Sequence, residues 1–347
     1  MDKIKINKLP APTWRHLKMN FAEIQAVEFQ CFAMPSMDVP DGVKTAVVKS
    51  AADVATGCGE GLSQMFSDSR LQFEVSGKVE KPVRINYRFD EGKIAASRIE
   101  IAAAPYAEAT VIAFYESECP ATGFGAVQTI VKAAEGAKIH LVQAVKVGES
   151  FEFINDVGIT EADSAQVEVT QLYLGGSSVY GGIFSDLSGY RSEFKNDIGY
   201  RLQNDENLDI NIVASHSGKK SSCEITAKGV LSDKAQKVFR GTIDFLNGAS
   251  GAKGAENEEV LLMSESVVNK TIPLILCAEE DVEGSHGASV GRIDENFIFY
   301  MMSRGISEER IYQIKAKAKI LSIMNHIDDN ETNARILEWL GGDEYAE

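Results

Sequence analysis

The chain is short of basic residues. Of its 347 residues, 35 are Lys or Arg and 51 are Asp or Glu, which gives a formal net charge of -16 at pH 7. A protein that binds DNA or RNA needs a basic surface to neutralise phosphates, and no local cluster of Lys and Arg supplies one here. Nucleic acid is therefore not an expected partner.

Cysteine is scarce and scattered. No Cys-x-x-Cys pair occurs, so the sequence carries neither a zinc ribbon nor a thioredoxin-type redox site. A chain of this length buries enough apolar surface to fold without disulfides, so we expect reduced thiols in the cytoplasm. The five cysteines are Cys31, Cys58, Cys119, Cys223 and Cys277.

Long apolar runs are also missing. The longest, such as the IPLILCA run at 272–278, are shorter than ten residues. A helix needs about 20 apolar residues to cross a bilayer. The first 20 residues lack the apolar stretch of a secretory signal. These absences predict a soluble cytoplasmic protein with no membrane partner.

Nucleotide and hydrolase motifs are absent as well. The glycine-rich GASGAKG at 248–254 lacks the Gly-Lys-Ser/Thr ending of a phosphate-binding loop. No dinucleotide fingerprint, Gly-x-Ser-x-Gly or His-Glu-x-x-His motif occurs. We interpret GASGAKGAENEE (248–259) as an exposed flexible loop. No catalytic residue is predicted, and we expect the chain not to be an enzyme.

What the sequence does contain is a long series of short alternating segments. From about residue 71, apolar and polar residues alternate, as at Leu71, Phe73 and Val75, and this pattern recurs for over 200 residues between Gly, Ser, Asn and Asp turns. Strict alternation predicts strands, and no amphipathic helix separates them, which excludes a βαβ fold. A large sandwich, a barrel, a propeller and a β-solenoid stay open. No exact repeat supports a propeller, and length does not limit a solenoid, which grows by adding coils.

Both ends of the chain read as helical. Loosely spaced apolar residues and the segment at 43–55 predict interrupted helices before residue 68. After residue 293, Ser307 precedes a segment whose apolar stripe ends at Met324, and Asp328 resembles the start of a capping box for a last helix. The predicted organisation is an N-terminal helical region (1–68), a β-core (69–292) and a C-terminal helical region (293–347).

The densest group of metal-binding side chain types lies between Cys277 and His286, with four acids between them. A thiolate with an imidazole suits iron, zinc or an iron–sulfur centre. The competing interpretation makes Cys277 a buried strand residue and His286 a turn histidine. Spacing alone favours that second interpretation, and one Cys and one His cannot complete a four-ligand site without another chain.

Two other cysteines have weaker local signals. His216 lies in a polar turn seven residues before Cys223, which we interpret as a turn histidine and a strand cysteine. Cys119 precedes a proline and is expected to be an exposed loop thiol.

Three blocks in the C-terminal third resemble the signature of the SufB/SufD family, the scaffold subunits of the SUF iron–sulfur cluster assembly machine. They are KGVLSDKAQKVFRGTI (228–243), LLMSES (261–266) and SHGASVGRIDENFIFYMMSRGIS (285–307), and their order and spacing match as well as their wording. The HSGKKSS turn at 216–222 and the PAPTWRHLKMN segment at 10–20 are also similar to the family.

The resemblance implies a mainly β fold, a right-handed parallel β-helix flanked by N- and C-terminal helical regions. It implies that the C-terminal helices dock the partner ATPase, SufC, an ABC-type subunit, which fits a chain with no phosphate loop of its own. It also implies a homodimer or a SufB/SufD heterodimer, a sulfur-donating desulfurase system, and a transient iron–sulfur cluster as cargo. The sequence does not reveal whether a flavin takes part.

The resemblance also implies roles for particular residues. In the SufB branch a cysteine on a late strand is thought to receive sulfur, and Cys277 falls on that position. In the SufD branch the histidine of the Ser-His-Gly motif is functional, and His286 falls there; SHGASVGRID is SufD-like wording. Both are expected to hold the cluster, and Cys223 and Cys119 are candidates for a sulfur relay. The acids expected to guide ferrous iron are Glu279, Glu280, Asp281 and Glu283.

Two alternatives accompany the scaffold interpretation. One is a purely structural SufD-like adaptor that holds no cluster of its own. The other is a β-helix enzyme acting on polysaccharide, which the missing secretion signal and the presence of only two tryptophans disfavour.

Overall fold

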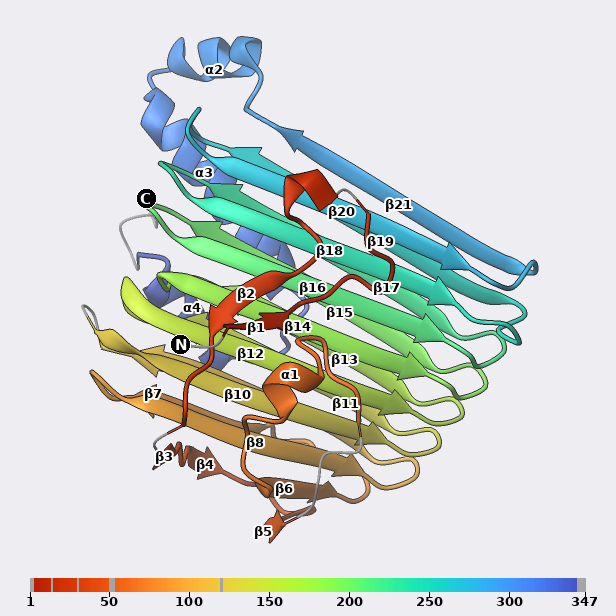
Figure 1. The fold of residues 1–347 in the computed structure, drawn as a ribbon. Coiled ribbons are helices and arrows are strands. Elements are labelled where there is room, and N and C mark those ends of the chain that lie inside the picture. Colours follow the sequence, from red (N-terminus) through yellow and green to blue (C-terminus); the bar gives the residue numbers. More distant parts are fainter. Residues whose placement is uncertain (1–2, 14, 30, 50–53, 119–120, 342–347) are drawn as a thin grey trace.

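The computed structural model describes residues 3–13, 15–29, 31–49, 54–118 and 121–341. Its centre is a β-solenoid of about eight coils, made of two facing parallel sheets (Figure 1). Successive strands alternate between the sheets, so each coil contributes one strand to each of them. This confirms the solenoid among the architectures left open by the alternating pattern.

The two sheets run along the whole solenoid. The parallel strands of the first sheet are β6 (Ser69–Val75), β8 (Ile94–Ala103), β10 (Thr122–Ala133), β12 (Ser150–Glu161), β14 (Ser178–Leu187), β16 (Asn207–His216), β18 (Gln236–Phe245) and β20 (Val268–Cys277). Those of the second sheet are β7 (Val83–Phe89), β9 (Glu108–Ser117), β11 (Lys138–Lys146), β13 (Gln166–Tyr173), β15 (Glu193–Leu202), β17 (Ser222–Leu231), β19 (Ala252–Leu262) and β21 (Val282–Gly291).

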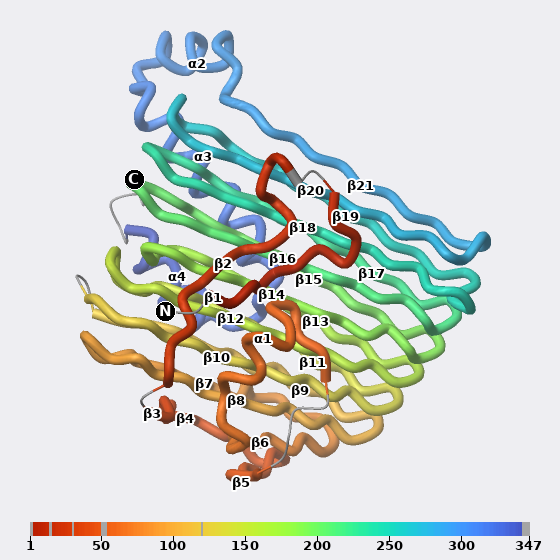
Figure 2. Tube along the Cα trace, in the orientation of Figure 1, coloured from red at the N-terminus to blue at the C-terminus, as the bar shows by residue number. Residues whose placement is uncertain are grey.

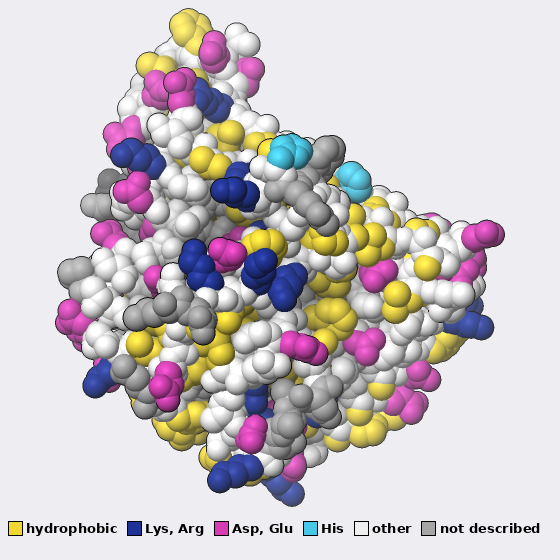
Figure 3. All heavy atoms as spheres, viewed as in Figure 1, with side chains coloured by type: hydrophobic (Ala, Val, Ile, Leu, Met, Phe, Trp, Pro, Cys, Tyr) yellow, Lys and Arg dark blue, Asp and Glu magenta, His cyan; other side chains and the backbone are white. Residues whose placement is uncertain are grey.

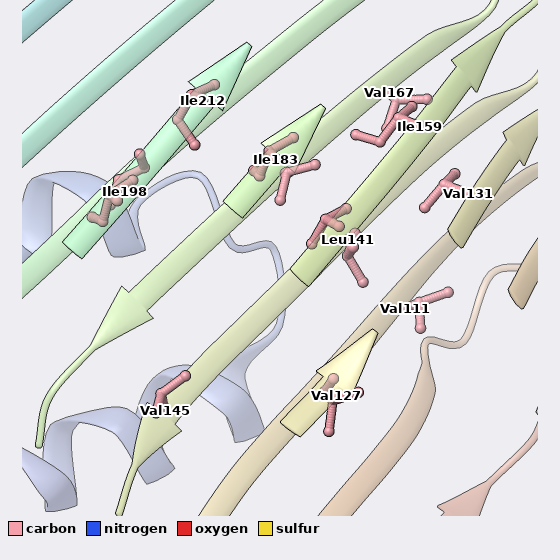
Figure 4. Packing of buried hydrophobic residues seen from close by; sticks show 14 of the residues in the cluster. Val111, Val127, Val131, Leu141, Val145, Ile159, Val167, Ile183, Ile198 and Ile212 are labelled. Atoms are coloured by element: carbon pink, nitrogen blue, oxygen red, sulfur yellow. The ribbon is translucent and has the colours of Figure 1, made fainter. Parts of the chain in front are cut away.

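The core lies between the sheets. Residues that alternate along each strand point inward, and side chains such as Val127, Leu141, Ile183 and Ile212 pack against their counterparts in neighbouring coils (Figure 4). Burial of each such side chain contributes about 1.5–3 kcal/mol. Because every coil repeats this arrangement, the core is a continuous apolar column that positions the last coil.

The N-terminal segment is not the helical region that the sequence predicts. It forms short strands, one 3-10 turn (Arg15–Leu17) and a single four-residue helix, α1 (Glu60–Ser63). The strands are β1 (Lys3–Ile6), β2 (Ala22–Gln25), β3 (Cys31–Phe32), β4 (Ser36–Asp38) and β5 (Val43–Lys49). The chain crosses the outer face of the first sheet (Figure 2).

Sheet pairing explains this difference. The segment at 43–55 predicted a helix, but β5 pairs antiparallel with β6 along its whole length, and pairing with an existing sheet edge overrides local propensity. Residues 50–53 of that predicted helix lie outside the described residues. Ile6, Ile24 and Leu62 are buried in a cluster that also contains Ile154 of β12, so this segment covers the first sheet as short strands and loops.

The C-terminal helices are present as predicted: α2 (Glu295–Met302), α3 (Glu308–Met324) and α4 (Asn330–Trp339). The Ser307 hydroxyl accepts a hydrogen bond from Arg310 N and so caps α3. The cap of α4 is Asp329 rather than the expected Asp328, because its carboxylate accepts from Thr332 N at 2.8 Å.

Helices α3 and α4 cover the outer face of the second sheet. Ile320, Ile323 and Ile336 are fully buried in a cluster with Val142 and Leu172 of that sheet. Helix α2 instead projects beyond the last coil, and none of its eight residues is buried (Figure 1). No helix among the described residues is long and apolar enough to cross a membrane.

The acid-rich segment after residue 251 is a strand and not the predicted flexible loop. Residues 252–259 belong to β19, which pairs with β17 and β21. Glu256 and Glu258 are buried inside the solenoid. The interior of the last coils is therefore polar as well as apolar.

The two ends of the solenoid differ. At the start, the short antiparallel strands β5 and β4 cover the edges of β6 and β7. At the other end, β20 and β21 each pair on one side only within the described residues, and nearly all of β21 is exposed. The last coil thus presents two uncovered parallel edges and an uncovered interior.

Candidate functional site

Cys277 is the last residue of β20 and lies on the open coil. It is a free, exposed thiol whose Sγ donates a hydrogen bond to the Glu279 carbonyl oxygen at 3.0 Å. Its register partner in the coil below is Phe245, which is fully buried. The interpretation of Cys277 as a buried strand residue is therefore wrong, and the thiol is accessible to a metal or a sulfur donor.

His286 lies in the middle of β21 and not in a turn, and its side chain is exposed. A Cβ added at Gly284 would lie 3.0 Å from the Cε2 atom of Phe245, which is buried in the core. Position 284 of β21 therefore faces the solenoid interior. Since side chains alternate along a strand, His286 faces the same way, over Glu256, its register partner in β19. Among the described residues, no hydrogen bond joins His286 to Cys277.

The acids between Cys277 and His286 fasten the last coil to the one below. Glu279 accepts from the backbone N–H of Gly248 at 3.0 Å, and hydrogen bonds from backbone groups lower the pKa of its carboxyl. Asp281 accepts from a serine hydroxyl of the same lower turn at 2.7 Å. Glu283 pairs with a lysine of β19 at 3.0 Å. Glu280 is exposed, and an iron-guiding role for the four acids stays a prediction.

A second Cys–His pair lies inside the solenoid. Cys223 is in strand β17, as predicted, but His216 is the last residue of β16 and not a turn histidine, and the sequence did not indicate that the two side chains are in contact. His216 Nε2 lies 3.2 Å from Cys223 Sγ, and the other ring nitrogen is 2.8 Å from the Ser221 hydroxyl. The imidazole stacks on Phe245 with ring centroids 4.9 Å apart. Burial raises the pKa of the Cys223 thiol to about 12 and lowers that of His216 to about 4, so both groups are neutral at pH 7.

Two glycines stand between Cys223 and the open end. Cys223 is in register with Gly254 of β19, and Gly254 with Gly284 of β21. A Cβ at Gly254 would lie 3.1 Å from Cys223 Sγ, so any side chain there would press on the thiol. At the two register positions above Cys223, Gly254 and Gly284 therefore place no side chain between the buried thiol and the last coil. Cys119, the other predicted relay residue, lies outside the described residues.

Buried charges lie directly below the open coil. Lys237 and Glu258 form an ion pair whose side chains are both fully buried. The Thr271 hydroxyl of β20 donates to Glu258 at 2.6 Å. Burial, and then the nearby Glu258, raise the pKa of Glu256 to about 8. The sequence does not reveal this arrangement, because the partners of Glu258 lie 21 and 13 residues away, on the preceding and following strands β18 and β20.

Comparison with known proteins identifies the family. Residues 86–314 match the family model described as SUF system FeS cluster assembly, SufBD core domain. The chain is 30% identical over 169 residues to the iron–sulfur cluster assembly protein SufD of Bacillus subtilis, which is 49% of this chain and 35% of that protein. It is 29% identical over 254 residues to SufD of Escherichia coli, which is 73% of this chain and 60% of that protein.

A third relative is an iron–sulfur cluster assembly SufBD family protein of Pyrococcus horikoshii. It is 27% identical over 187 residues, which is 52% of this chain and 37% of that protein. The chain thus spans less than two thirds of the length of each of these relatives. The matched core domain covers most of the solenoid and reaches into α3, and the chain belongs to the SufB/SufD family of the SUF system.

Proposed function

We propose that the chain is a scaffold subunit of the SUF machinery that pairs with a second scaffold chain through its open last coil. A nascent iron–sulfur cluster, the cargo of the machine, would be held at that junction before its transfer to an apoprotein. The observation that carries this proposal is that Cys277 and His286 are both exposed on the last coil, whose edges no other described strand covers.

The ligand count supports a junction between two chains. One thiolate and one imidazole fall short of the four protein ligands that iron–sulfur clusters usually take. A partner coil added to β20 and β21 would satisfy their unpaired backbone groups and bring its own donors. The partner would be a second copy of this chain or a SufB-type subunit, with sulfur supplied by a desulfurase system.

Helix α2 supports an ATPase partner. Phe299, Tyr300 and Met302 are 76%, 51% and 50% exposed. Three large hydrophobic side chains exposed to water on one eight-residue helix indicate an interaction site. Hydrophobic side chains are exposed on this projecting part of the molecule, among acidic and basic ones (Figure 3). An apolar helix face of this kind suits a protein partner, and in the proposal that partner is the SufC-type ATPase.

Cys223 fits the role of a sulfur relay in this scheme. It lies two coils below the end of the solenoid, beneath the stacked glycines Gly254 and Gly284. A persulfide sulfur on Cys223 would pass to the Cys277 thiolate as one S–S bond forms and the other breaks, leaving Cys223 as the leaving thiolate. The raised pKa of Cys223 makes it a slow nucleophile in the isolated chain, so sulfur loading would need opening of the last coils.

Anaerobic co-purification with a SufC-type ATPase and a SufB-type partner, followed by reconstitution with iron and sulfide, tests the proposal. We expect a complex that holds iron and shows a cluster absorption band. Cys277→Ala and His286→Ala should weaken that band, whereas Cys31→Ala, which removes another exposed thiol, should not. An unchanged band in both site variants would remove Cys277 and His286 from the role.

A structural adaptor is the second candidate, because two of the relatives are named SufD. In that case the chain would still form the complex with the ATPase through its C-terminal helices. The complex would retain its stoichiometry in both site variants, and the cluster would depend on the partner chain alone.

A further inference from the structure

A group of metal-ligating side chains lies far from the open coil, where the turn after α3 meets the second sheet. Glu168 of β13, Asp197 of β15 and His326 of that turn each place one ligand atom within 4.8 Å of the others. They come from three separate elements, so an ion bound there would join the helical region to the solenoid. We call these three residues the seam cluster.

Asp197 is the centre of the seam cluster. It is 1% exposed, and its Oδ2 has no partner of hydrogen-bonding geometry. His326 Nδ1 lies 2.7 Å from this oxygen and Lys195 Nζ lies 2.8 Å from it. A buried carboxylate in this setting requires a positive charge close by.

An ammonium group already occupies the position of a cation. Lys195 Nζ lies 2.8 Å from Asp197 and 3.1 Å from Glu168, between the two carboxylates. Two carboxylates and one ammonium leave a net negative charge when the imidazole is neutral. The Lys195 side chain is 36% exposed on a flexible stem, so it can turn to solvent and leave the position to a stronger cation.

His140 of β11 lies beside the seam cluster, in register with Glu168. The His140 Nε2 lies 2.9 Å from the Thr170 hydroxyl. The outer face of the sheet beside it forms a shallow groove lined by His140 and Glu168 that opens to solvent. Glu168, one of the three seam residues, therefore lies at the edge of a groove that opens to solvent.

We propose that the seam cluster binds a divalent transition metal ion, of the zinc or ferrous class, through Asp197, Glu168 and His326, in place of the Lys195 ammonium. One imidazole with two carboxylates is a ligand set that such ions favour over magnesium or calcium. The bound ion ties the turn between α3 and α4 to the solenoid. The inference is independent of the proposed function, because it uses neither Cys277 nor His286.

Metal titration of the full chain tests the proposal, in a background carrying Cys277→Ala and His286→Ala so that the open coil contributes no ligands. Co²⁺ is the probe, followed by its d–d absorption, and Zn²⁺ binding is followed by thermal unfolding. Lys195→Met should bind Co²⁺ at least about ten-fold more tightly than the parent, because the competing ammonium is gone. His326→Ala in the Lys195→Met chain should abolish both the band and the Zn²⁺-dependent rise in Tm.

Glu224→Gln is the matched control, because Glu224 is an exposed acid in register with Lys195 on the same face of the sheet. It should leave Co²⁺ binding unchanged. Absence of Co²⁺ binding in Lys195→Met would overturn the proposal, and so would equal binding with and without His326. His326 is 37% exposed, so its variant is expected to fold. None of these outcomes depends on cluster assembly.

Discussion

The interior of the solenoid and its open end each contain a cysteine, a histidine and a Lys–Glu ion pair, and these two sets of groups have different properties. Inside, His216 contacts Cys223 at 3.2 Å, and Lys237 pairs with Glu258 out of contact with water. At the open end, Cys277 and His286 are exposed, and the pair of Lys253 with Glu283 is solvated.

In these two Cys–His pairs, contact between the side chains does not go with reactivity of the thiol. The closer Cys–His pair is the less reactive one, because burial raises the pKa of the Cys223 thiol and lowers that of the His216 imidazole. The thiolate is the nucleophile and the metal ligand, so a thiol held neutral reacts slowly in either role. Exposure at the open end, rather than contact, is what makes Cys277 and His286 candidates for the site.

Removing one member of the buried ion pair should have the largest effect on stability. Glu258→Ala leaves Lys237 as an uncompensated buried ammonium, and we expect a loss of about 3–5 kcal/mol in the free energy of unfolding. Urea denaturation followed by circular dichroism measures it. Glu283→Ala, which breaks the exposed pair, is the control and should leave the denaturation midpoint unchanged. Similar losses in the two variants would contradict the comparison.

Thiol alkylation should distinguish the buried Cys223 from the exposed Cys277 and Cys31. With a pKa of about 12, the Cys223 thiol should react about 10³-fold more slowly at neutral pH than an ordinary thiol of pKa about 8.5. Iodoacetamide labelling of the native chain, read by mass spectrometry, should modify Cys277 and Cys31 first. Labelling in denaturant is the control and should remove the difference. Fast native labelling of Cys223 would mean that the last coils open readily.

The buried imidazole should make stability depend on pH. The folded pKa of His216 is lowered to about 4 from a usual value of about 6.5, so the unfolded chain binds the proton more readily between these values. Stability is therefore complete above about pH 6.5 and falls as pH drops to about 4, by about 2–3 kcal/mol from this group. Comparing wild type with His216→Gln at pH 7 and pH 4.5 measures the effect. His286→Gln, on the exposed side, should keep the wild-type profile.

The smallest effect on stability is expected on helix α2. Because Phe299 is 76% exposed, Phe299→Ala should change the free energy of unfolding by less than about 0.5 kcal/mol. If this helix binds the ATPase, the same variant should lose affinity for it in a pull-down or calorimetric titration. Ile336→Ala, inside the packed face, is the contrasting variant and should lower stability. Unchanged ATPase affinity would separate α2 from docking.

Local patterns predicted the parts of the fold that depend on neighbouring residues. The alternation of apolar and polar residues predicted the strands of the solenoid, and Ser307 predicted the start of α3. The repeat was hidden because coil length varies: Phe124 pairs with Ile94, 30 residues earlier, whereas Glu193 pairs with Gln166, 27 residues earlier. A period that changes between coils leaves no exact self-match in the sequence.

Contacts between distant residues could not be predicted from the sequence. Strand β5 reads as a helix until it meets β6, and the acids of β19 read as a loop until Lys237 is placed beside them. Motif wording indicated Cys277 and His286 but not their position on an uncovered coil. The contact between His216 and Cys223 depends on the path of a whole coil, which no spacing of seven residues specifies.

The unequal ends of the solenoid would also limit the size of the assembly proposed above. At the start, β4 and β5 run antiparallel to their neighbours and interrupt the parallel stack, while β20 and β21 leave it open. A rod that was open at both ends could add units without limit and grow into a fibre. In the proposed pairing, one joining event would use the one open end that the described residues of each molecule present, so association would stop at two.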